Sequence, residues 1–438
     1  MNTKFIYKSA DFLFLLIPFL DFTLYIDCKF ADIRFTYLIY IFYFLIHIKS
    51  FISSVNFFDL VKKHRFIAAA AALIAAVSLY NISAGNNTLF LFLKQGLIIS
   101  ATAFISFMFV FNNKNNLEYI VNLYIKICFI FAAVGVFQEY SHFVNFKYGY
   151  FYDYIHLNNQ LSFSGNMLRV TSLTNEPSFL IYAMMPAFYI ALTSFLTKAR
   201  QSLIVQLRNI TIILCVFLTY SSLGYTGIFL SFASILFWNI RQIKFSRMLL
   251  FIITGLFLFC LGKNAVSERF FYTYKQLTHS VNLKNKETKE YVNMSSYYLA
   301  LHAKRAFDDF KHKPFFGTGL GSYTYPEHAL EIYKKFHYKK FFQISSEDVV
   351  NTSFRILSEL GLFGITLLLI FLFYNYIFDL SFQNKTNYFI IINNACLIYI
   401  LLRLLRNGSY YSDGLWIFIF MYYYSKKLFL EQNKNENA

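Results

Sequence analysis

Long apolar runs recur along almost the whole chain of 438 residues, and this feature limits its fold more than any other. A helix needs about 20 apolar residues to cross the roughly 30 Å of hydrocarbon in a bilayer. The runs predict an all-α polytopic membrane helix bundle of about twelve transmembrane helices, with a large, partly helical periplasmic loop. The predicted spans lie near residues 9–27, 34–49, 66–83, 89–112, 118–139, 177–197, 203–220, 224–240, 247–262, 354–377, 388–405 and 414–426.

The composition supports a membrane protein and excludes several other classes. Apolar and aromatic residues make up 57% of the chain and charged residues 14%, whereas soluble domains average roughly half and roughly a quarter. Disordered, collagen-like, coiled-coil and disulfide-stapled classes are therefore excluded. The 40 basic residues outnumber the 23 acidic ones. In a membrane protein such an excess sets orientation, so no nucleic-acid partner is predicted. The five cysteines form no metal-binding pattern, so no metal is predicted.

The basic residues also predict the orientation of the chain, because Lys and Arg accumulate in cytoplasmic loops. Alternating the spans from a cytoplasmic N-terminus places most basic residues of the short loops on one side, so both termini are predicted to be cytoplasmic. Residues 1–262 then hold the first nine spans and an outer loop at 140–176. Residues 263–353 form the large periplasmic loop, and residues 354–438 hold the last three spans and a cytoplasmic tail.

Part of the large loop is predicted to be helical. Between residues 297 and 312, apolar side chains recur at helical spacing, and polar side chains form the adjoining flank. We expect an amphipathic helix that rests on the membrane face. The apolar stripe contains Leu299, Ala303, Ala306, Phe307 and Phe310, and the flank contains His302, Arg305, Asp309 and His312.

Orientation does not explain basic residues on the outer side, which makes them informative. Arg169 shortly precedes a predicted helix start, where Asn175 or Thr174 can cap the helix and Pro177 fits the first turn. A helix N-terminus that faces outward presents free N–H groups and positive potential, and it binds phosphate readily. In the alternative interpretation, Arg169 is a solvated loop residue and Glu176 complements the helix dipole.

Three more cations are expected near the same outer surface. Arg403 and Arg406 are three residues apart, hence on one helix face, at the outer end of the eleventh span. Lys94 lies just inside the outer end of the fourth. Each can also reach the interface without any functional role. Several cations at the same end of a helix bundle indicate a site for an anionic substrate, because guanidinium groups bind phosphate in a bidentate manner.

Other polar features have simpler interpretations. The run Gly317-x-Gly319-x-Gly321 lacks the strand-to-helix context of a nucleotide loop and is interpreted as a glycine turn. Arg355 and Glu359 have the spacing of an intrahelical ion pair. The loop histidines are candidate bases or structural residues.

Three segments together resemble the O-antigen polymerase and ligase superfamily of bacterial inner membranes. Arg169 followed by Asn175-Glu176-Pro177-Ser178-Phe179 is similar to the Glu-Pro-Ser segment of Wzy-type O-antigen polymerases. The run from Lys313 to Ser322 follows the family's Pro, apolar pair and Gly-x-Gly in the large outer loop. Asn351 through Ser358-Glu359-Leu360-Gly361-Leu362-Phe363-Gly364 is like the helix start after that loop.

The resemblance implies that outward-facing arginines hold the pyrophosphate of an undecaprenyl-linked glycan. Arg169 and Arg305 match those positions, although Arg305 is one residue further from Gly317 than in the polymerases. Ligases carry a His just before the Asn that ends the loop, where this chain has Val350. The candidate catalytic residues are Arg169, Glu176 and Arg305, with Glu176 as general base, and the candidate substrate-binding residues are Lys94, Asn175, His302, His312, Gly317, Gly319, Arg403 and Arg406.

The function expected from this resemblance is a cofactor-free glycosyltransferase. It would be an O-antigen or related surface polysaccharide polymerase that joins undecaprenyl-pyrophosphate-linked oligosaccharide repeat units at the periplasmic face of the inner membrane. Its expected partners are those lipid-linked repeat units, membrane lipids and a chain-length regulator. An O-antigen ligase of the same superfamily and a lipid-linked glycan flippase or transporter remain as alternatives. A transporter usually shows internal repeats, and none is visible here.

Overall fold

The computed structural model describes residues 3–20, 25–28, 31–54, 62, 65–151, 161–164, 166–197, 201–239, 245–261, 294–324, 351–378 and 388–436. Within these ranges the chain is almost entirely helical, which confirms the all-α polytopic membrane fold. Of the predicted periplasmic loop 263–353, only 294–324 and 351–353 are described, so Val350 lies outside the described residues.

A helix occupies each of the twelve predicted span positions. Six described helices are long and apolar enough to cross a membrane: those within Phe35–Ser53, Leu89–Asn112, Lys114–Phe143, Pro177–Thr197, Thr352–Asn375 and Tyr388–Arg406. The helices at the twelve positions are α1 Thr3–Leu16, α2 Phe35–Ser54, α4 Arg65–Ser83, α5 Leu89–Asn112, α6 Leu117–Phe143, α8 Pro177–Thr197, α9 Leu203–Leu218, α10 Ser222–Asn239, α11 Phe245–Leu261, α16 Thr352–Asn375, α17 Tyr388–Arg406 and α18 Leu415–Glu436.

The first predicted span is wrong at both ends. Helix α1 begins at Thr3 and gives way to a 3-10 turn at Ile17–Phe19, because Pro18 offers no backbone N–H and cannot continue a regular helix. The last residues of the predicted span belong to strand β1, Tyr25–Cys28, which pairs antiparallel with β2, Ala31–Arg34. A second short hairpin pairs β3, Phe163–Ser164, with β4, Met167–Leu168.

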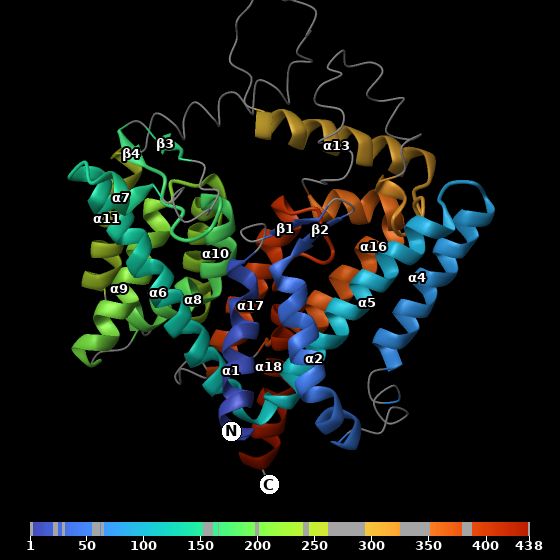
Figure 1. The fold of residues 1–438 in the computed structure, drawn as a ribbon, viewed down its shortest axis with the longest axis horizontal. Helices are drawn as coiled ribbons and strands as arrows, with labels where there is room; N and C mark the ends of the chain where they lie inside the picture. The colour runs from blue at the N-terminus through green and yellow to red at the C-terminus, as the bar shows by residue number, and fades with distance from the viewer. Residues whose placement is uncertain are drawn as a thin grey trace, which may run out of the picture.

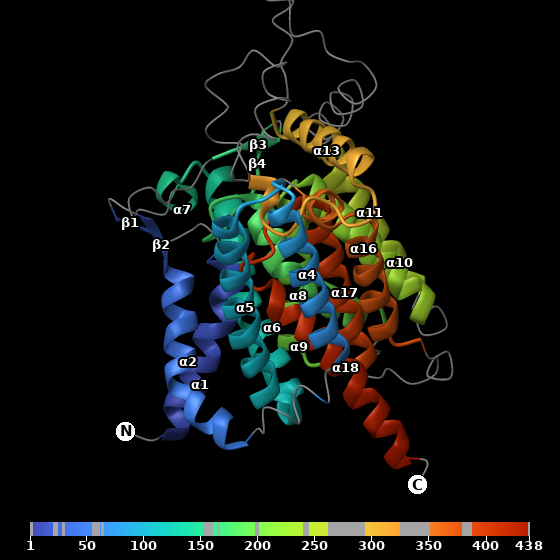
Figure 2. The same ribbon diagram turned by 90° about the vertical axis from the view of Figure 1, so that its right-hand side faces the viewer.

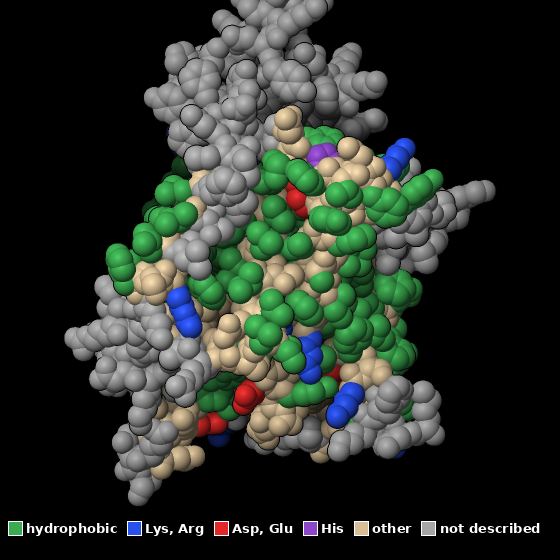
Figure 3. All heavy atoms as spheres, turned by 90° about the vertical axis from the view of Figure 1, so that its left-hand side faces the viewer, with side chains coloured by type: hydrophobic (Ala, Val, Ile, Leu, Met, Phe, Trp, Pro, Cys, Tyr) green, Lys and Arg blue, Asp and Glu red, His purple; other side chains and the backbone are tan. Residues whose placement is uncertain are grey.

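Both chain termini lie at one end of the bundle, and helix α13, Met294–His312, lies across the other end (Figures 1 and 2). Helix α17 packs against α8, α10, α16 and α18 and occupies the centre. Hydrophobic side chains cover much of the flank seen in Figure 3. Among the described residues, Ile204, Phe229 and Leu256 are large apolar side chains that are exposed. An apolar flank around a packed interior is what a lipid-facing bundle requires.

The glycine-rich segment 313–322 fills a break in helix α16. Gly361 adopts a left-handed φ of 58° there, so two helical hydrogen bonds from residues 362 and 363 to residues 358 and 359 are missing. The amides of Leu362 and Phe363 donate instead to the carbonyls of Pro314 and Phe315, at 2.8 and 3.0 Å. In return, the amides of Thr318 and Gly319 donate to the carbonyls of Ser358 and Glu359, at 3.0 and 2.7 Å.

Replacing Gly361 by alanine is expected to destabilise the protein by about 1–3 kcal/mol. A Cβ at this position would lie 2.7 Å from the Pro314 carbonyl oxygen, and φ is unfavourable for any residue with a side chain. The thermal unfolding midpoint in detergent measures the effect. Gly96→Ala is the matched control, because a Cβ at Gly96 in α5 meets nothing within 4 Å. Equal midpoints for the two variants would contradict the prediction.

Candidate anion-binding pocket

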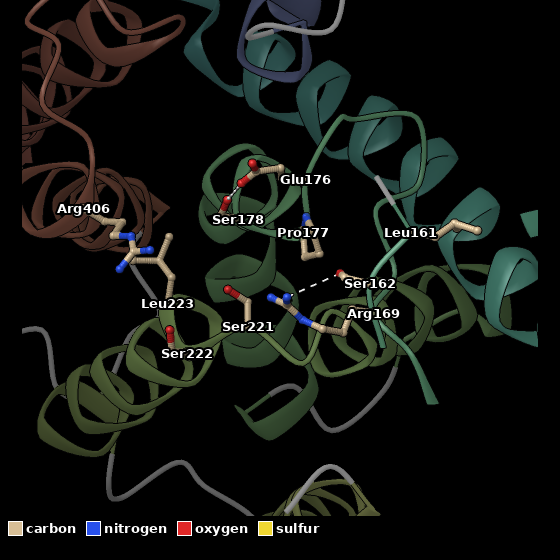
Figure 4. Close-up of a pocket in the computed structure, with 10 residues that line it drawn as sticks. All are labelled: Leu161, Ser162, Arg169, Glu176, Pro177, Ser178, Ser221, Ser222, Leu223 and Arg406. Carbon is tan, nitrogen blue, oxygen red and sulfur yellow. Dashed lines mark hydrogen bonds between the residues drawn. The ribbon is translucent and has the colours of Figure 1, made fainter. Parts of the chain in front are cut away.

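Figure 4 shows a pocket of about 230 Å³. Its lining includes Ser162 and Arg169, which flank the β3–β4 hairpin, and this hairpin lies at the end of the bundle opposite the chain termini (Figure 1). Three predicted site residues from separate segments meet in the pocket. Arg169 directly follows β4, Glu176 directly precedes α8, and Arg406 ends α17. The other lining residues are Leu161, Ser162, Pro177, Ser178, Ser221, Ser222 and Leu223.

The two arginines reach this pocket from opposite sides, with Ser221 between them (Figure 4). Both are partly exposed. The Nη1 of Arg169 donates to the Ser162 hydroxyl at 3.4 Å, and the Arg169 amide donates to the Ser162 carbonyl at 2.9 Å. The Ser162 contacts therefore tie both the backbone and the side chain of Arg169 to the β3–β4 hairpin.

The N-terminus of α8 forms another wall of the pocket. Pro177 occupies its first turn, as predicted, and the Glu176 carbonyl accepts hydrogen bonds from the amides of Phe179 and Leu180. The exposed Glu176 carboxylate accepts a 3.0 Å hydrogen bond from the Ser178 hydroxyl. The predicted helix start is confirmed, and Glu176 lines the same pocket as the two arginines.

Polar side chains at the start of α16 fix the end of α17 that carries Arg406. The last carbonyls of a helix lack partners within it. Here Asn351 Nδ2 donates to the Leu405 carbonyl at 2.7 Å and Ser353 Oγ to that of Leu404 at 3.1 Å, while Thr352 Oγ1 donates to that of Asn407. Sequence reasoning missed this cap and the lining serines, because neither follows a recognisable spacing.

Arg403 does not line the pocket, although it is one helical turn from Arg406. Its guanidinium is buried, stacks 4.1 Å from the ring centre of Tyr182, and donates to the Tyr399 hydroxyl and the Asp413 carbonyl, both at 3.0 Å. These contacts join α17 to α8 and to the segment before α18. The structure therefore shows Arg403 in packing contacts, and its predicted contact with substrate stays a prediction.

Two further predicted substrate-binding residues also lie outside the lining. Lys94 is exposed on α5 between Leu93 and Leu97, which are themselves 47% and 69% exposed. It thus projects from an exposed apolar stretch of α5, as expected of a lysine that reaches the interface. Asn175 is half-buried next to Glu176 but does not line the pocket.

His302 and Arg305 lie on the buried face of α13 and do not line the pocket. Helix α13 confirms the predicted helix at 297–312, but these two residues of its polar flank are buried, whereas Phe307 of the apolar stripe is 52% exposed. Arg305 stacks 4.1 Å from the ring centre of Tyr323, and His302 Nδ1 lies 2.8 Å from the Tyr323 hydroxyl. The Ser358 hydroxyl donates to Asp309. His302 and Arg305 are buried because Tyr323 supplies these partners, and Asp309 bonds to α16.

The burial of His302 predicts that the packing of α13 against Tyr323 and α16, here called the docking of α13, depends on pH. Burial, assisted by the nearby Arg305 charge, lowers the pKa of His302 to about 4, from an ordinary value of about 6.5. Undocked His302 takes up a proton below its ordinary pKa, while docked His302 stays neutral until about pH 4. Docking is therefore fully stable at neutral pH and loses stability as the pH falls through this window.

Hydrogen exchange of α13 amides, corrected for intrinsic rates, measures this dependence. We expect protection to fall on mild acidification in the wild type and to change less in His302→Phe, which keeps an aromatic ring against Tyr323. His312→Gln is the control, because His312 is exposed at the end of the same helix. Equal pH dependence in wild type and His302→Phe would exclude His302 as the source.

The predicted glycines and the predicted ion pair lie near α13. Gly317 and Gly319 have φ of +62° and +95°. Gly317 packs against the backbone of α16, and the Gly319 amide donates to the Glu359 carbonyl, which agrees with the glycine-turn interpretation. Arg355 Nε lies 3.0 Å from Glu359 Oε1, and both side chains are buried. The intrahelical ion pair is therefore confirmed.

The pocket has the chemistry of an anion site. Two guanidinium groups, several hydroxyl donors and the N-terminus of α8 face one small volume that contains a single lining carboxylate. This excess of donors and positive charge fits a phosphate or diphosphate. Glu176 adds a group that can accept a proton beside it.

The comparison with known families adds one match. Residues 209–369 match the model of a family described as O-antigen ligase, which confirms the predicted resemblance to the O-antigen polymerase and ligase superfamily. The matched range includes Ser221, Ser222, Arg305 and the glycine-rich segment, and it ends before Arg406. No curated protein matches the chain.

Proposed function

We propose that this chain, with residues 209–369 placed in the O-antigen polymerase and ligase superfamily of membrane glycan-transferring enzymes, is a surface-polysaccharide polymerase. It would join oligosaccharide repeat units carried on undecaprenyl pyrophosphate at the periplasmic face of the inner membrane. The observation that carries the proposal is the meeting of Arg169, Arg406 and the α8 N-terminus in one pocket.

In this proposal the pocket holds the diphosphate of the donor. A hydroxyl oxygen of the acceptor glycan attacks the anomeric carbon, and the bond between that carbon and the diphosphate oxygen breaks. The diphosphate leaves with the bonding electrons, and Arg169 and Arg406 stabilise the charge that develops on it. Glu176 takes the proton from the attacking hydroxyl.

The proposed pair of guanidinium groups differs from the pair expected from the sequence. Arg305 stacks on Tyr323 and lies 4.0 Å from Asp309, outside the pocket lining. Arg406 lines the pocket instead. The proposal therefore assigns diphosphate binding to Arg169 and Arg406, and it assigns to Arg305 the anchoring of α13.

A ligase is the second candidate, because the matching family model bears that description. The sequence favours the polymerase, since Val350 occupies the position where the ligases carry a histidine.

Glycan analysis of a deletion strain separates the candidates. Loss of a polymerase leaves a single repeat unit on the outer-core lipid, whereas loss of a ligase or a flippase leaves none. We expect single repeats, and restoration of long polymer by the wild-type chain. Bare outer-core lipid in the deletion strain would contradict the polymerase assignment.

A further inference from the structure

Gln138 is a buried glutamine on α6 whose side chain holds the segment directly after Arg169. It is fully buried. Its Oε1 accepts hydrogen bonds from the amides of Thr171 and Ser172, at 3.1 and 2.9 Å. Its Nε2 donates to the Tyr150 carbonyl and the Thr171 hydroxyl, both at 3.2 Å. Both the oxygen and the nitrogen of the Gln138 side-chain amide therefore bond to residues of the segments that follow α6 and β4.

The segment held by Gln138 is strained and closely packed against α6. Ser172 adopts a left-handed φ of 53°, which residues other than glycine rarely adopt without surrounding support. Its hydroxyl donates to the Phe131 carbonyl at 2.7 Å. One turn before Gln138, a Cβ on Gly135 would lie 2.8 Å from the Val170 Cγ1, so the Val170 side chain packs directly against the α6 backbone.

Each backbone amide from Arg169 to Ser172 has a defined partner. The Arg169 amide bonds Ser162, the Val170 amide bonds the Leu218 carbonyl at 3.1 Å, and the next two amides share Gln138. Without Gln138, two buried amides lose their acceptor, a state that folded proteins avoid. The segment must then shift, and Arg169 shifts with it. A displacement of about 1 Å at a reacting centre can cost about 100-fold in rate.

We propose that Gln138 is a positioning residue that sets the Arg169 guanidinium in the pocket. This inference rests on the proposed function, in which Arg169 binds the donor diphosphate. Gln138 itself touches no substrate. Gln138 therefore affects binding only through the position of Arg169. A residue that only stabilises the fold would show no such dependence on Arg169.

The test measures the affinity of the full chain in lipid nanodiscs for undecaprenyl diphosphate. Gln138→Met keeps the side-chain length and removes both hydrogen-bonding groups. We expect it to weaken binding about tenfold, the effect of one misplaced hydrogen bond to a charged group. Gln138→Glu keeps an acceptor for the two amides and should restore most of the affinity. In an Arg169→Ala background, Gln138→Met should cause no further loss.

Asn393→Leu is the matched control for stability. Asn393 is a fully buried amide in α17 that donates to the carbonyls of Asn375 and Tyr422 and to the Ser425 hydroxyl, away from Arg169. We expect this variant to lower the unfolding temperature without changing affinity. Equal loss of affinity in Gln138→Met and Asn393→Leu would overturn the positioning role, as would further loss in the Arg169→Ala background.

The remaining outcomes separate the inference from the proposed function. If Arg169→Ala weakens binding and Gln138→Met does not, the positioning role is overturned and the diphosphate site stands. If Arg169→Ala binds the lipid like the wild type, the proposed site and the positioning role both fail.

Discussion

Arg169→Lys is expected to lower polymer formation about 100-fold or more, with the amount of membrane protein unchanged. Lysine keeps the positive charge but lacks the planar guanidinium group, which can donate hydrogen bonds to two phosphate oxygens at once. In the pocket, Arg169 faces Arg406 across Ser221 (Figure 4). In the proposed reaction, the substitution therefore weakens the stabilisation of the negative charge that develops on the leaving diphosphate. Elongation of a lipid-linked repeat by the purified enzyme measures the effect.

Lys126→Gln serves as the control for Arg169→Lys. Lys126 is an exposed cation on α6 that does not line the pocket, and its removal should leave elongation within about twofold of wild type, since most surface changes are nearly neutral. Arg406→Lys should reduce elongation in the same direction as Arg169→Lys. The double variant should lose less than the product of the two effects, because residues that act as a unit are not additive. Wild-type polymer from Arg169→Lys would refute the role of Arg169.

Arg355→Met is expected to destabilise the fold by about 3–5 kcal/mol, because it leaves the Glu359 carboxylate buried without its counter-charge. Arg355 also donates to the Gly408 carbonyl at 3.1 Å and to Gln95 Oε1 at 3.2 Å. One side chain therefore ties α16 to α5 and to the segment after α17. The fraction of folded protein in detergent, followed over temperature, measures the loss.

The double variant Arg355→Met with Glu359→Leu tests the reason for that loss. Replacing both partners by apolar side chains removes the unpaired charge, so part of the lost stability should return. Full recovery is not expected, because the hydrogen bonds to Gly408 and Gln95 stay broken. A single variant as stable as wild type, or a double variant less stable than the single one, would contradict this account.

The structure separates the basic residues that were predicted to face outward into different roles. Arg169 and Arg406 line the pocket, whereas Arg403 and Arg305 stack on Tyr182 and Tyr323. Lys94 is exposed on α5 between exposed leucines. Four of these residues were expected near an anionic substrate on grounds of charge and side, and Arg305 was expected there from the family resemblance. Only two meet at the pocket, because burial against aromatic rings satisfies two of the others.

The sequence by itself determined the features that depend on neighbouring residues. Apolar runs predicted a helix at each span position, helical periodicity predicted α13, and the spacing of Arg355 and Glu359 predicted their ion pair. The start of α8 followed from Pro177 and its preceding polar residues. These predictions succeed because hydrophobic length, helix capping and contacts four residues apart are local properties of a chain.

Only the tertiary structure decided which side chains meet. Arg403 and Arg406 share a helix face, yet Arg403 stacks on the Tyr182 ring of α8, and Arg406 lies one turn nearer the helix end and reaches the pocket. The lining serines and the hydrogen bonds of Gln138 likewise join segments far apart in the chain. Helix rotation and register arise from packing between helices, and a pattern within one helix does not encode what its neighbours present to it.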